Sequence, residues 1–489
     1  MEPKPGMDRR RFLKAAALTT AALAVVPRAV LGGLSHAAPS GQLNLACIGM
    51  GWQGMRMLAG LLKRSDVRVV AVCDPNTDSH DYIGWGRAKE GARGDRGGRE
   101  PGREAVDAHY GRSKPSGASK GCAAYADFRE MLEKQNDLDA VHIVTPDHSH
   151  ATLAIAAMTK GKHAAMHKPV ANRMHEVRLT VDTARTTGQV THLHAWRDCR
   201  ELYTIREWIR QGVIGPVREV HRWLYKPIWP QGTPHLPADH PAVPKGFDWD
   251  LWLGPVPHRP YSPKYTHAVY RGWYDFGGGC MADMGYYGLW MDWRVLQLGA
   301  ATSAEACASI ACEVRGYRSG TVKNDVSFPH ASTVRLHLPG RGKMPPCEVF
   351  WYDGGMRPPT PKELVDAGRQ MPHTGVMFVG DEGKILAGYL YEKPRILPEK
   401  RMREAADVKT PDVKIVGTSD EWINAFRTGK PSRGSFQNVQ HLAEAICLSN
   451  VAIRLNTRLT WDTAAMRISN NPAANRYLRR EAYRKGWEL

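Results

Sequence analysis

Three glycines and one aspartate near residue 50 have the types and spacing of a dinucleotide-binding site. The apolar stretch 43–48 leads into GMGWQG, residues 49–54, and then into an amphipathic helical segment. In this strand-to-helix context, the backbone amides of a G-x-G-x-x-G turn face a pyrophosphate. A second predicted strand, 67–73, ends at Asp74, 20 residues after Gly54, where a carboxylate accepts hydrogen bonds from ribose hydroxyls. The candidate cofactor-binding residues here are Gly49, Gly51, Trp52, Gln53, Gly54 and Asp74.

The aspartate favours NAD over NADP, because a carboxylate at that position repels a 2′-phosphate. Arginines in the following stretch 84–102, GWGRAKEGARGDRGGREPG, keep NADP as the alternative. We expect this stretch to be a solvated, poorly ordered loop inserted after the second strand, since glycine and arginine dominate it. NAD is therefore the predicted cofactor.

Strands and helices continue to alternate as far as residue 169. The sequence predicts helices near 128 and over 151–159, and buried strands over 139–144 and 161–166. This alternation predicts an α/β fold with a doubly wound parallel sheet, whose ligands bind at the carboxyl ends of the strands. Two polar motifs fall at such ends, TPDHSH after one strand and HKP after the next. They add Thr145, Pro146, His148, His150, Lys168 and Pro169 to the candidate cofactor-binding residues.

The first 37 residues resemble a twin-arginine export signal. Arg9 and Arg10 precede Phe12-Leu13-Lys14, an apolar stretch over 15–26 and small residues at 35–38. The apolar stretch is too short to span a bilayer, and none approaching 18 residues follows it, so we expect no membrane anchor. The sequence thus predicts a signal peptide over 1–37, a periplasmic or otherwise exported protein, and the twin-arginine machinery as a partner.

The charge and the metal-binding residue types exclude two classes of function. The net charge of +18 falls to about +14 without the leader, and the basic residues are scattered, so no nucleic-acid partner is expected. An acidic glycan stays open as a partner. The nine cysteines contain no Cys-x-x-Cys pair and lie mostly in apolar runs, which predicts buried thiols. His192, His194 and His235 lack ligand-like spacing, so no metal is expected.

Taken in order, these motifs resemble the Gfo/Idh/MocA oxidoreductases. The resemblance rests on the glycine turn, TPDHSH, Lys168-Pro169 and DMGYY at 283–287. The stretches IREWIRQGVIGPVREVHRW, DWDLWLGPVPHRPY, RGWYDFGGG and EWINAFRTGKPS are similar to a large exported bacterial branch of the family. The resemblance implies an NAD(P)-binding Rossmann domain, here 42–190, then a substrate and oligomerisation domain, 191–489, with an open, mostly antiparallel sheet. A homo-oligomer is also implied.

The second half of the chain supports this second domain independently. The stretches 217–225, 306–314, 332–338, 347–353 and 375–380 have strand-like patterns without regular helices between them. Two helices are predicted within 418–456. The excursion 226–263 contains ten prolines together with Trp229, Trp249 and Trp252. These tryptophans either line the substrate site or a subunit contact, or simply anchor the excursion.

The family resemblance also implies the catalytic residues. In the family, a lysine that corresponds to Lys168 contacts both substrate and cofactor, and its ammonium can stabilise a developing alkoxide. His167 stands where the family usually has glutamate, which removes a negative neighbour of this lysine. Asp283 and Tyr287 are one helical turn apart after the glycines 277–279. We expect Asp283 to orient the sugar and Tyr287 to exchange its proton, with Lys168 lowering the tyrosine pKa; Tyr287 as core packing is the alternative.

Three functions follow from these residues. The first is an NAD(P)-dependent oxidoreductase acting on a CH-OH group of a sugar, cyclitol or glycoside, with tightly bound cofactor. The second is an NAD-dependent glycoside hydrolase or lyase that oxidises its substrate transiently and then eliminates a leaving group. The third is a non-catalytic sugar-binding protein. The leader favours closed redox cycles, because little free NAD is expected outside the inner membrane.

Overall fold

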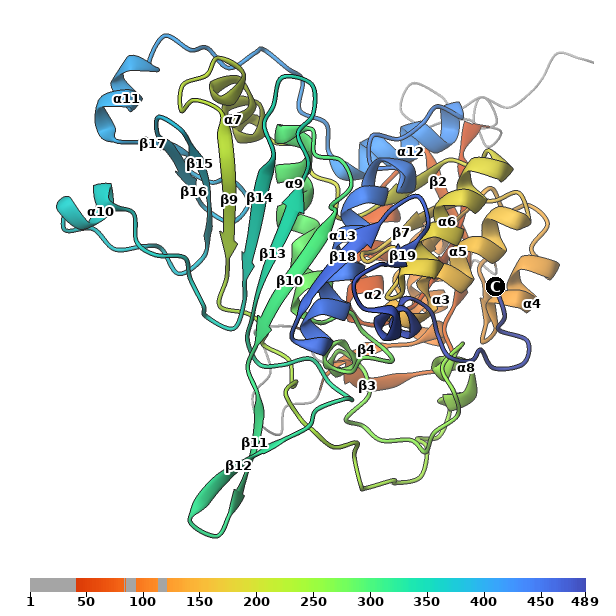
Figure 1. The fold of residues 1–489 in the computed structure, drawn as a ribbon. Coiled ribbons are helices and arrows are strands. Elements are labelled where there is room, and N and C mark those ends of the chain that lie inside the picture. Colours follow the sequence, from red (N-terminus) through yellow and green to blue (C-terminus); the bar gives the residue numbers. More distant parts are fainter. Residues whose placement is uncertain (1–40, 83, 85–93, 113–120) are drawn as a thin grey trace, which may run out of the picture.

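Two β-sheets, each formed by a different part of the chain, organise the molecule (Figure 1). The computed structural model describes residues 41–82, 84, 94–112 and 121–489. The predicted signal peptide lies outside the described residues. Within them, no helix is both long enough and apolar enough to cross a bilayer. The predicted α/β class, with a parallel sheet followed by a mostly antiparallel one, is confirmed.

Six parallel strands form the N-terminal sheet in the doubly wound order β5-β2-β1-β6-β7-β8. The strand order reverses between β1 and β6, and ligands bind such sheets at the carboxyl ends beside this point. Helices on both faces bury the strands, which explains their continuous apolar sequences. The strands are β1 (Leu43–Ile48), β2 (Val67–Cys73), β5 (Ala123–Tyr125), β6 (Ala140–Ile143), β7 (His163–Met166) and β8 (Thr191–Leu193); the helices are α2 (Trp52–Leu61), α3 (Arg99–Gly111), α4 (Phe128–Lys134), η3 (Asp147–Ser149), α5 (His150–Thr159) and α6 (Met174–Thr187).

The glycine-rich stretch 84–102 is more ordered than predicted. Residues 85–93 lie outside the described residues, but β4 (Asp95–Gly97) pairs with β3 (Ser79–Tyr82), and α3 begins at Arg99. Gly97 and Gly102 both pack so closely on Met50 that a side chain at either position would press on it. The loop prediction is therefore wrong for residues 94–102, because these glycines permit close packing against the turn after β1.

Nine strands form the second sheet in the order β17-β16-β15-β9-β14-β13-β10-β18-β19. Its pairs are antiparallel except β9 with β14. Helix α13 lies between the two sheets (Figure 1) and packs against both α6 and β10. The strands are β9 (Val217–Trp223), β10 (Ser303–Ala308), β13 (Ser332–Leu338), β14 (Cys347–Tyr352), β15 (Gly375–Gly380), β16 (Lys384–Ala387), β17 (Arg395–Leu397), β18 (Arg458–Asp462) and β19 (Arg467–Ile468); the helices are α7 (Arg200–Arg210), α9 (Tyr286–Leu296), α10 (Lys362–Asp366), α11 (Glu399–Glu404), α12 (Thr418–Thr428), α13 (Phe436–Leu455) and η6 (Pro472–Leu478).

A buried ion pair fixes α9 to the second sheet. Arg222 on β9 and Asp292 on α9 are both fully buried, and two hydrogen bonds of 2.8 and 2.7 Å join them. The Tyr391 hydroxyl donates a third hydrogen bond, of 2.8 Å, to Asp292. Such a fully paired carboxylate is costly to disturb, so the position of α9 is well defined. This helix begins at Tyr286 and carries Tyr287.

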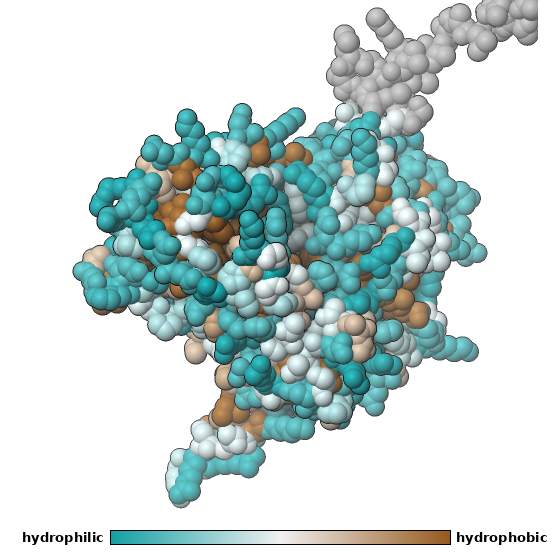
Figure 2. Space-filling model, turned by 45° about the horizontal axis from the view of Figure 1, so that its top comes forward, coloured by the Kyte–Doolittle hydropathy of each residue, from teal (hydrophilic) through white to brown (hydrophobic). Residues whose placement is uncertain are grey.

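The apolar run 306–314 divides between two strands. β10 ends at Ala308, whereas β11 (Ala311–Arg315) pairs only with β12 (Arg318–Val322) among the described strands. The resulting hairpin projects from the body of the molecule (Figures 1 and 2). It exposes large side chains, including Tyr317 at 91%. The strand-like pattern of residues 306–314 therefore comes partly from the nine-stranded sheet and partly from the projecting β11–β12 hairpin.

Helix α12 completes the core of the N-terminal domain, although it lies late in the chain. Trp422, Ile423 and Phe426 on this helix pack with Leu45 and its neighbours in one buried cluster. The sequence predicted the two helices within 418–456 but not this docking.

The prediction of buried thiols is confirmed for seven of the nine cysteines, all of which are free.

The excursion 226–263 contains one short helix, α8 (Trp249–Leu253), within the described structure. Its tryptophans Trp229, Trp249 and Trp252 are buried. The rings of Trp249 and Trp252 stack at 4.8 Å inside a cluster of aromatic side chains. They therefore anchor the excursion, and Trp229 and Trp252 also line the pocket described below.

Candidate active site

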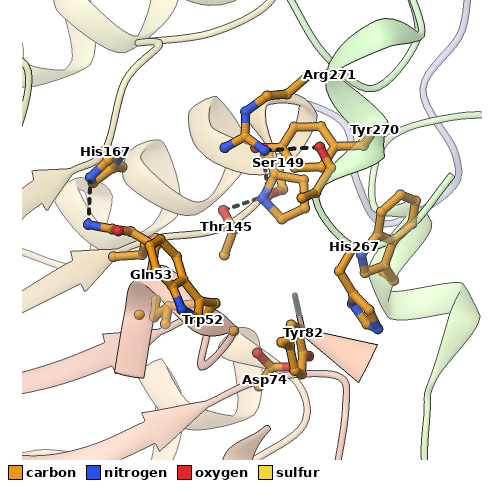
Figure 3. A pocket seen from close by; sticks show the side chains of 18 of the residues that line it. Trp52, Gln53, Asp74, Tyr82, Thr145, Ser149, His167, His267, Tyr270 and Arg271 are labelled. Atoms are coloured by element: carbon orange, nitrogen blue, oxygen red, sulfur yellow. Dashed lines mark hydrogen bonds between the residues drawn. The ribbon is translucent and has the colours of Figure 1, made fainter. Parts of the chain in front are cut away.

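A pocket of about 420 Å³ lies at the carboxyl ends of β1, β2, β6 and β7. One wall comes from the N-terminal sheet, and the opposite wall comes from the excursion and the segment that follows it (Figure 3). In Figure 3, His167, Gln53 and Asp74 face His267, Tyr270 and Arg271 across this space. Of the predicted site residues, the pocket brings together Gly49, Gly51, Trp52, Gln53, Gly54, Asp74, Thr145, Pro146, Lys168, Asp283 and Tyr287.

The glycine turn needs glycine for steric reasons. Gly49 has a φ of +91°, and a Cβ there would overlap the Val144 carbonyl. A Cβ at Gly54 would overlap the Gly49 carbonyl, so the turn and α2 approach too closely for any side chain. Gly51 is the N-cap of α2 and lines the pocket. It has no side chain that could cap the helix. The free amides at this helix start are suited to a pyrophosphate.

Asp74 is held rigidly at the end of β2. Its carboxylate accepts hydrogen bonds from the backbone amides of Met50, at 2.6 Å, and Asn76, at 2.8 Å. Burial raises the pKa of Asp74 to about 6, and these two amides only partly offset the effect. The side chain lines the pocket and keeps acceptor capacity for a ligand hydroxyl group.

Lys168, Asp283 and Arg271 form a charged cluster at another part of the pocket, in which Lys168 is buried and the other two side chains are partly buried. Lys168 follows β7, Arg271 lies in η4 (Val269–Gly272), and Asp283 lies in the π-helical turn η5 (Met281–Gly285). The Lys168 ammonium and the Arg271 Nε, at 2.9 Å, both donate to Asp283 Oδ1. Burial alone would raise the pKa of Asp283, but the two cations outweigh it and hold this pKa below its usual value. The cluster thus carries net positive charge, which suits a developing alkoxide.

Tyr287 is next to this cluster, yet it is not the activated base that the sequence predicted. The Lys168 ammonium lies 5.4 Å from the centroid of the tyrosine ring and is paired with Asp283. Burial raises the pKa of Tyr287, the negative charge of Asp283 raises it further, and only Arg271 opposes them. The prediction that Lys168 lowers this pKa is therefore wrong. At neutral pH the phenol keeps its proton and serves as a hydrogen-bond donor.

Three predicted cofactor-binding residues do not line the pocket. His148 contacts the Trp252 carbonyl oxygen at 2.8 Å. His150 contacts the carbonyl oxygens of Pro169, at 2.6 Å, and Thr145, at 2.9 Å. Both histidines are buried, and they fix the backbone of the loops that follow β6 and β7. His148, His150 and Pro169 therefore support the pocket walls rather than face a ligand.

Asp147, in the motif TPDHSH that also contains His148 and His150, joins the two walls of the pocket. It is buried and accepts hydrogen bonds of 3.1 Å from both the Tyr270 hydroxyl and the Gly278 amide. Gly278 belongs to the stretch RGWYDFGGG, residues 271–279, and Tyr270 directly precedes it. The glycines of that stretch therefore position η5, which carries Asp283.

His167, at the position of the family glutamate, is neutral. Burial lowers its pKa well below the ordinary value, and Lys168 adds to the effect. Its ring contacts that of His194, which in turn contacts the rings of His142 and His192. Burial lowers the pKa of His142 to about 4 and that of His192 to about 3. In the part of the chain that the structure describes, no three ligand-type side chains are placed to hold a metal ion.

Sequence reasoning missed Arg271, Tyr82, His267 and Trp487, all of which line the pocket. Arg271 begins the motif RGWYDFGGG, and its place in this family-like motif was the available signal. The ring of Tyr82 packs over Gly51 and lies 4.1 Å from the ring of His267. No local pattern indicates that contact, because its partners are far apart in the chain.

Both domains match sequence models of one oxidoreductase family. Residues 83–194 match its NAD-binding Rossmann fold, and residues 204–305 match its C-terminal α/β domain. The chain belongs to the Gfo/Idh/MocA oxidoreductase family. The N-terminal domain of this family member is thus an NAD-binding Rossmann domain, in agreement with the glycine turn and Asp74.

Relatives similar in sequence carry glycosidase names. The chain is 29% identical over 246 residues to glycosyl hydrolase family 109 protein 2 of Shewanella sp. strain ANA-3, covering 46% of this chain and 48% of the relative. It is 30% identical over 225 residues to a glycosyl hydrolase family 109 protein of Shewanella amazonensis, covering 43% and 44%. The chain therefore spans about half the length of the curated relatives it matches.

Solved structures share the fold at low sequence identity. The WlbA dehydrogenase of Bordetella pertussis, solved with NADH and UDP-GlcNAcA, superposes with a TM-score of 0.52 at 15% identity, covering 86% of this chain and 99% of that one. An NAD-binding protein from Listeria innocua gives a TM-score of 0.51 at 16% identity, covering 86% and 97%. At these identities, the likeness concerns the fold alone.

Proposed function

We propose that this protein is an NAD-dependent enzyme that oxidises a CH-OH group of a sugar, cyclitol or glycoside. The observation that carries the proposal is one pocket that joins the glycine turn and Asp74 to the charged Lys168–Asp283–Arg271 cluster. NAD, when bound, supplies the acceptor for the hydride that leaves the substrate carbon. NADP stays the alternative, although a rigid carboxylate at position 74 disfavours its 2′-phosphate.

In this proposal, the residues of the cluster accept the proton of the substrate hydroxyl and stabilise the charges that result. Lys168 first gives one proton of its ammonium to solvent water. As the hydride then leaves the carbon, the resulting amine takes the hydroxyl proton, and the oxygen becomes a carbonyl. Asp283 stabilises the ammonium that results, and Arg271 holds Asp283 in place. The neutral Tyr287 hydroxyl donates a hydrogen bond to the same oxygen while negative charge builds up on it.

A redox-neutral glycosidase is the second candidate, favoured by the names of the Shewanella relatives. Oxidation at one carbon acidifies the neighbouring C–H, so a base removes that proton and the glycosidic leaving group departs. Water then adds to the unsaturated sugar, and the hydride returns to the oxidised carbon. The overall result is hydrolysis, with no external electron acceptor consumed.

We also propose that the protein is exported in folded form with its cofactor bound. The support is the predicted twin-arginine leader, residues 1–37, on a chain with an NAD-binding domain. Cofactor lost outside the inner membrane would not be replaced there, which favours a reaction cycle that regenerates NAD within the site.

Incubation with aryl glycosides in D2O tests the proposal and separates its two forms. Transient oxidation and elimination place deuterium on the carbon next to the oxidised one and release the aryl group without accumulating NADH. A net oxidoreductase accumulates NADH, or reduces a second sugar, and leaves the glycosidic bond intact. Hydrolysis without deuterium incorporation, or sugar binding without any turnover, would contradict both forms.

A further inference from the structure

The segment 480–487 crosses from the second domain back to the N-terminal sheet. Arg480 is buried and donates a hydrogen bond of 2.6 Å to Glu176 on α6. Arg484 then donates to the Gly254 carbonyl at 2.8 Å, directly after α8. In Figure 1 the chain ends beside α4 and α8. This route brings Trp487, which is only 5% exposed, to the wall of the pocket.

Trp487 is held firmly against the N-terminal domain. Its ring lies 5.7 Å from the ring of Phe128, the first residue of α4. The Arg129 guanidinium lies 4.5 Å from the centroid of the indole, and its Nη1 donates a hydrogen bond of 2.8 Å to the Gly486 carbonyl. Arg484 approaches the same indole at 5.8 Å. Contacts from Phe128, Arg129 and Arg484 thus fix the position of the indole.

The place of Trp487 in the sheet topology assigns it to the adenosine half of the pocket. Phe128 follows the end of β5 and Asp74 follows the end of β2, both on the side of the switch point opposite Lys168. In doubly wound domains, the acid after the second strand marks the ribose of the adenosine half. Beyond Asp74, apolar side chains of different elements line the pocket: Phe128, Leu153, Leu251, Trp252 and Trp487.

We propose that Trp487 is an adenine-binding residue, which forms with Phe128 the outer wall of a slot for the purine ring. The inference rests on the proposed use of NAD and goes beyond it, because it assigns cofactor retention to a segment outside the Rossmann domain. Indole and phenyl faces suit a flat heteroaromatic ring, and closing the slot from the solvent side slows release. Arg129 and Arg484 act as positioning residues for the indole.

The test compares two halves of the cofactor as separate probes. The dissociation constants of ADP-ribose and of nicotinamide mononucleotide are measured by calorimetry for the wild type, Trp487→Ala and Trp487→Phe, after any co-purified nucleotide has been removed from each. We expect ADP-ribose to bind about tenfold more weakly to Trp487→Ala, with nicotinamide mononucleotide unchanged. Trp487→Phe should restore most of the ADP-ribose affinity, because it keeps an aromatic face. Tyr317→Ala, on the exposed hairpin, is the matched control and should change neither constant.

Equal weakening of both probes, or an unchanged ADP-ribose constant in Trp487→Ala, would overturn the inference. If Trp487→Ala does not fold, Trp487→Leu keeps apolar volume without the ring, and the same weakening of ADP-ribose alone is expected. A wild type that binds neither ADP-ribose nor NADH would instead contradict the proposed function itself. Wild-type binding with an unaffected variant would contradict only the role of Trp487.

Discussion

The two aspartates of the pocket are both shielded from solvent, Asp74 almost fully and Asp283 partly, yet their pKa values shift in opposite directions. Asp74 accepts hydrogen bonds from two backbone amides, and these and the charge of Arg99 only partly offset the effect of burial, so its pKa rises to about 6. Asp283 meets the cations Lys168 and Arg271, and its pKa falls below the usual value. The comparison shows that the partners of a carboxylate decide whether desolvation leaves it titratable or permanently charged.

The two ends of the pocket also differ in the charged groups that they contain. The adenosine end combines one fixed carboxylate with apolar and aromatic walls, which suits it to hold a ligand. The Lys168 end combines three charged side chains from separate segments of the chain, which suits it to stabilise charge during a reaction. Substitutions at one end should therefore affect turnover, and substitutions at the other should affect cofactor binding.

Lys168→Met should have the largest effect. It removes the proposed proton acceptor and leaves Asp283 with Arg271 alone, so kcat should fall about a thousandfold. Bound nucleotide should be retained, because the adenosine end is untouched. Steady-state kinetics and the nucleotide content of the purified protein check both statements. Lys264→Met removes an exposed lysine that pairs with Asp239 and should leave kcat unchanged; an active Lys168→Met enzyme would refute the assignment.

Arg271→Met should lower kcat about a hundredfold, with little change in ADP-ribose affinity. The substitution removes one of the two cations that share Asp283 and much of the positive charge of the cluster. Kinetics together with calorimetry separate the two quantities. Arg218→Met breaks an exposed arginine–aspartate pair on the surface and provides the matched control. A loss of ADP-ribose affinity as large as the loss in kcat would contradict the proposed division between the adenosine end and the Lys168 end.

Tyr287→Phe should reduce kcat only about tenfold, the effect of losing one hydrogen bond to the reacting oxygen. Because burial and Asp283 raise the pKa of Tyr287, its phenol stays protonated across neutral pH. The pH profile of kcat should therefore keep its shape in the variant. Disappearance of a basic limb from the profile would restore Tyr287 as the catalytic base.

The pH dependence of ADP-ribose binding should report on Asp74. With a pKa of about 6, Asp74 is ionised at pH 7 and protonated at pH 5, where it loses acceptor capacity for the ribose hydroxyls. Affinity should therefore weaken about tenfold from pH 7 to pH 5. In Asp74→Asn this dependence should vanish, with weak binding at both values. Calorimetry at the two pH values is sufficient, and identical pH dependence in both proteins would exclude the role of Asp74.

The sequence predicted most of the elements that form the pocket because local patterns encode them. The strand 43–48, the glycine turn and the strand ending at Asp74 have continuous apolar runs and fixed spacing, and they fold as expected. Arg271 and Trp487 escaped prediction because they reach the pocket only through tertiary contacts. The prediction that Lys168 lowers the pKa of Tyr287 failed for an electrostatic reason, because no sequence pattern shows that the Lys168 ammonium is paired with Asp283.

A crystal structure of the protein with NAD bound tests the division between the two ends most directly. We expect the adenosine ribose at Asp74 and the nicotinamide ring beside the Lys168–Asp283–Arg271 cluster. A nucleotide bound in the reverse orientation, or one whose nicotinamide lies away from Lys168, would contradict the proposed chemistry.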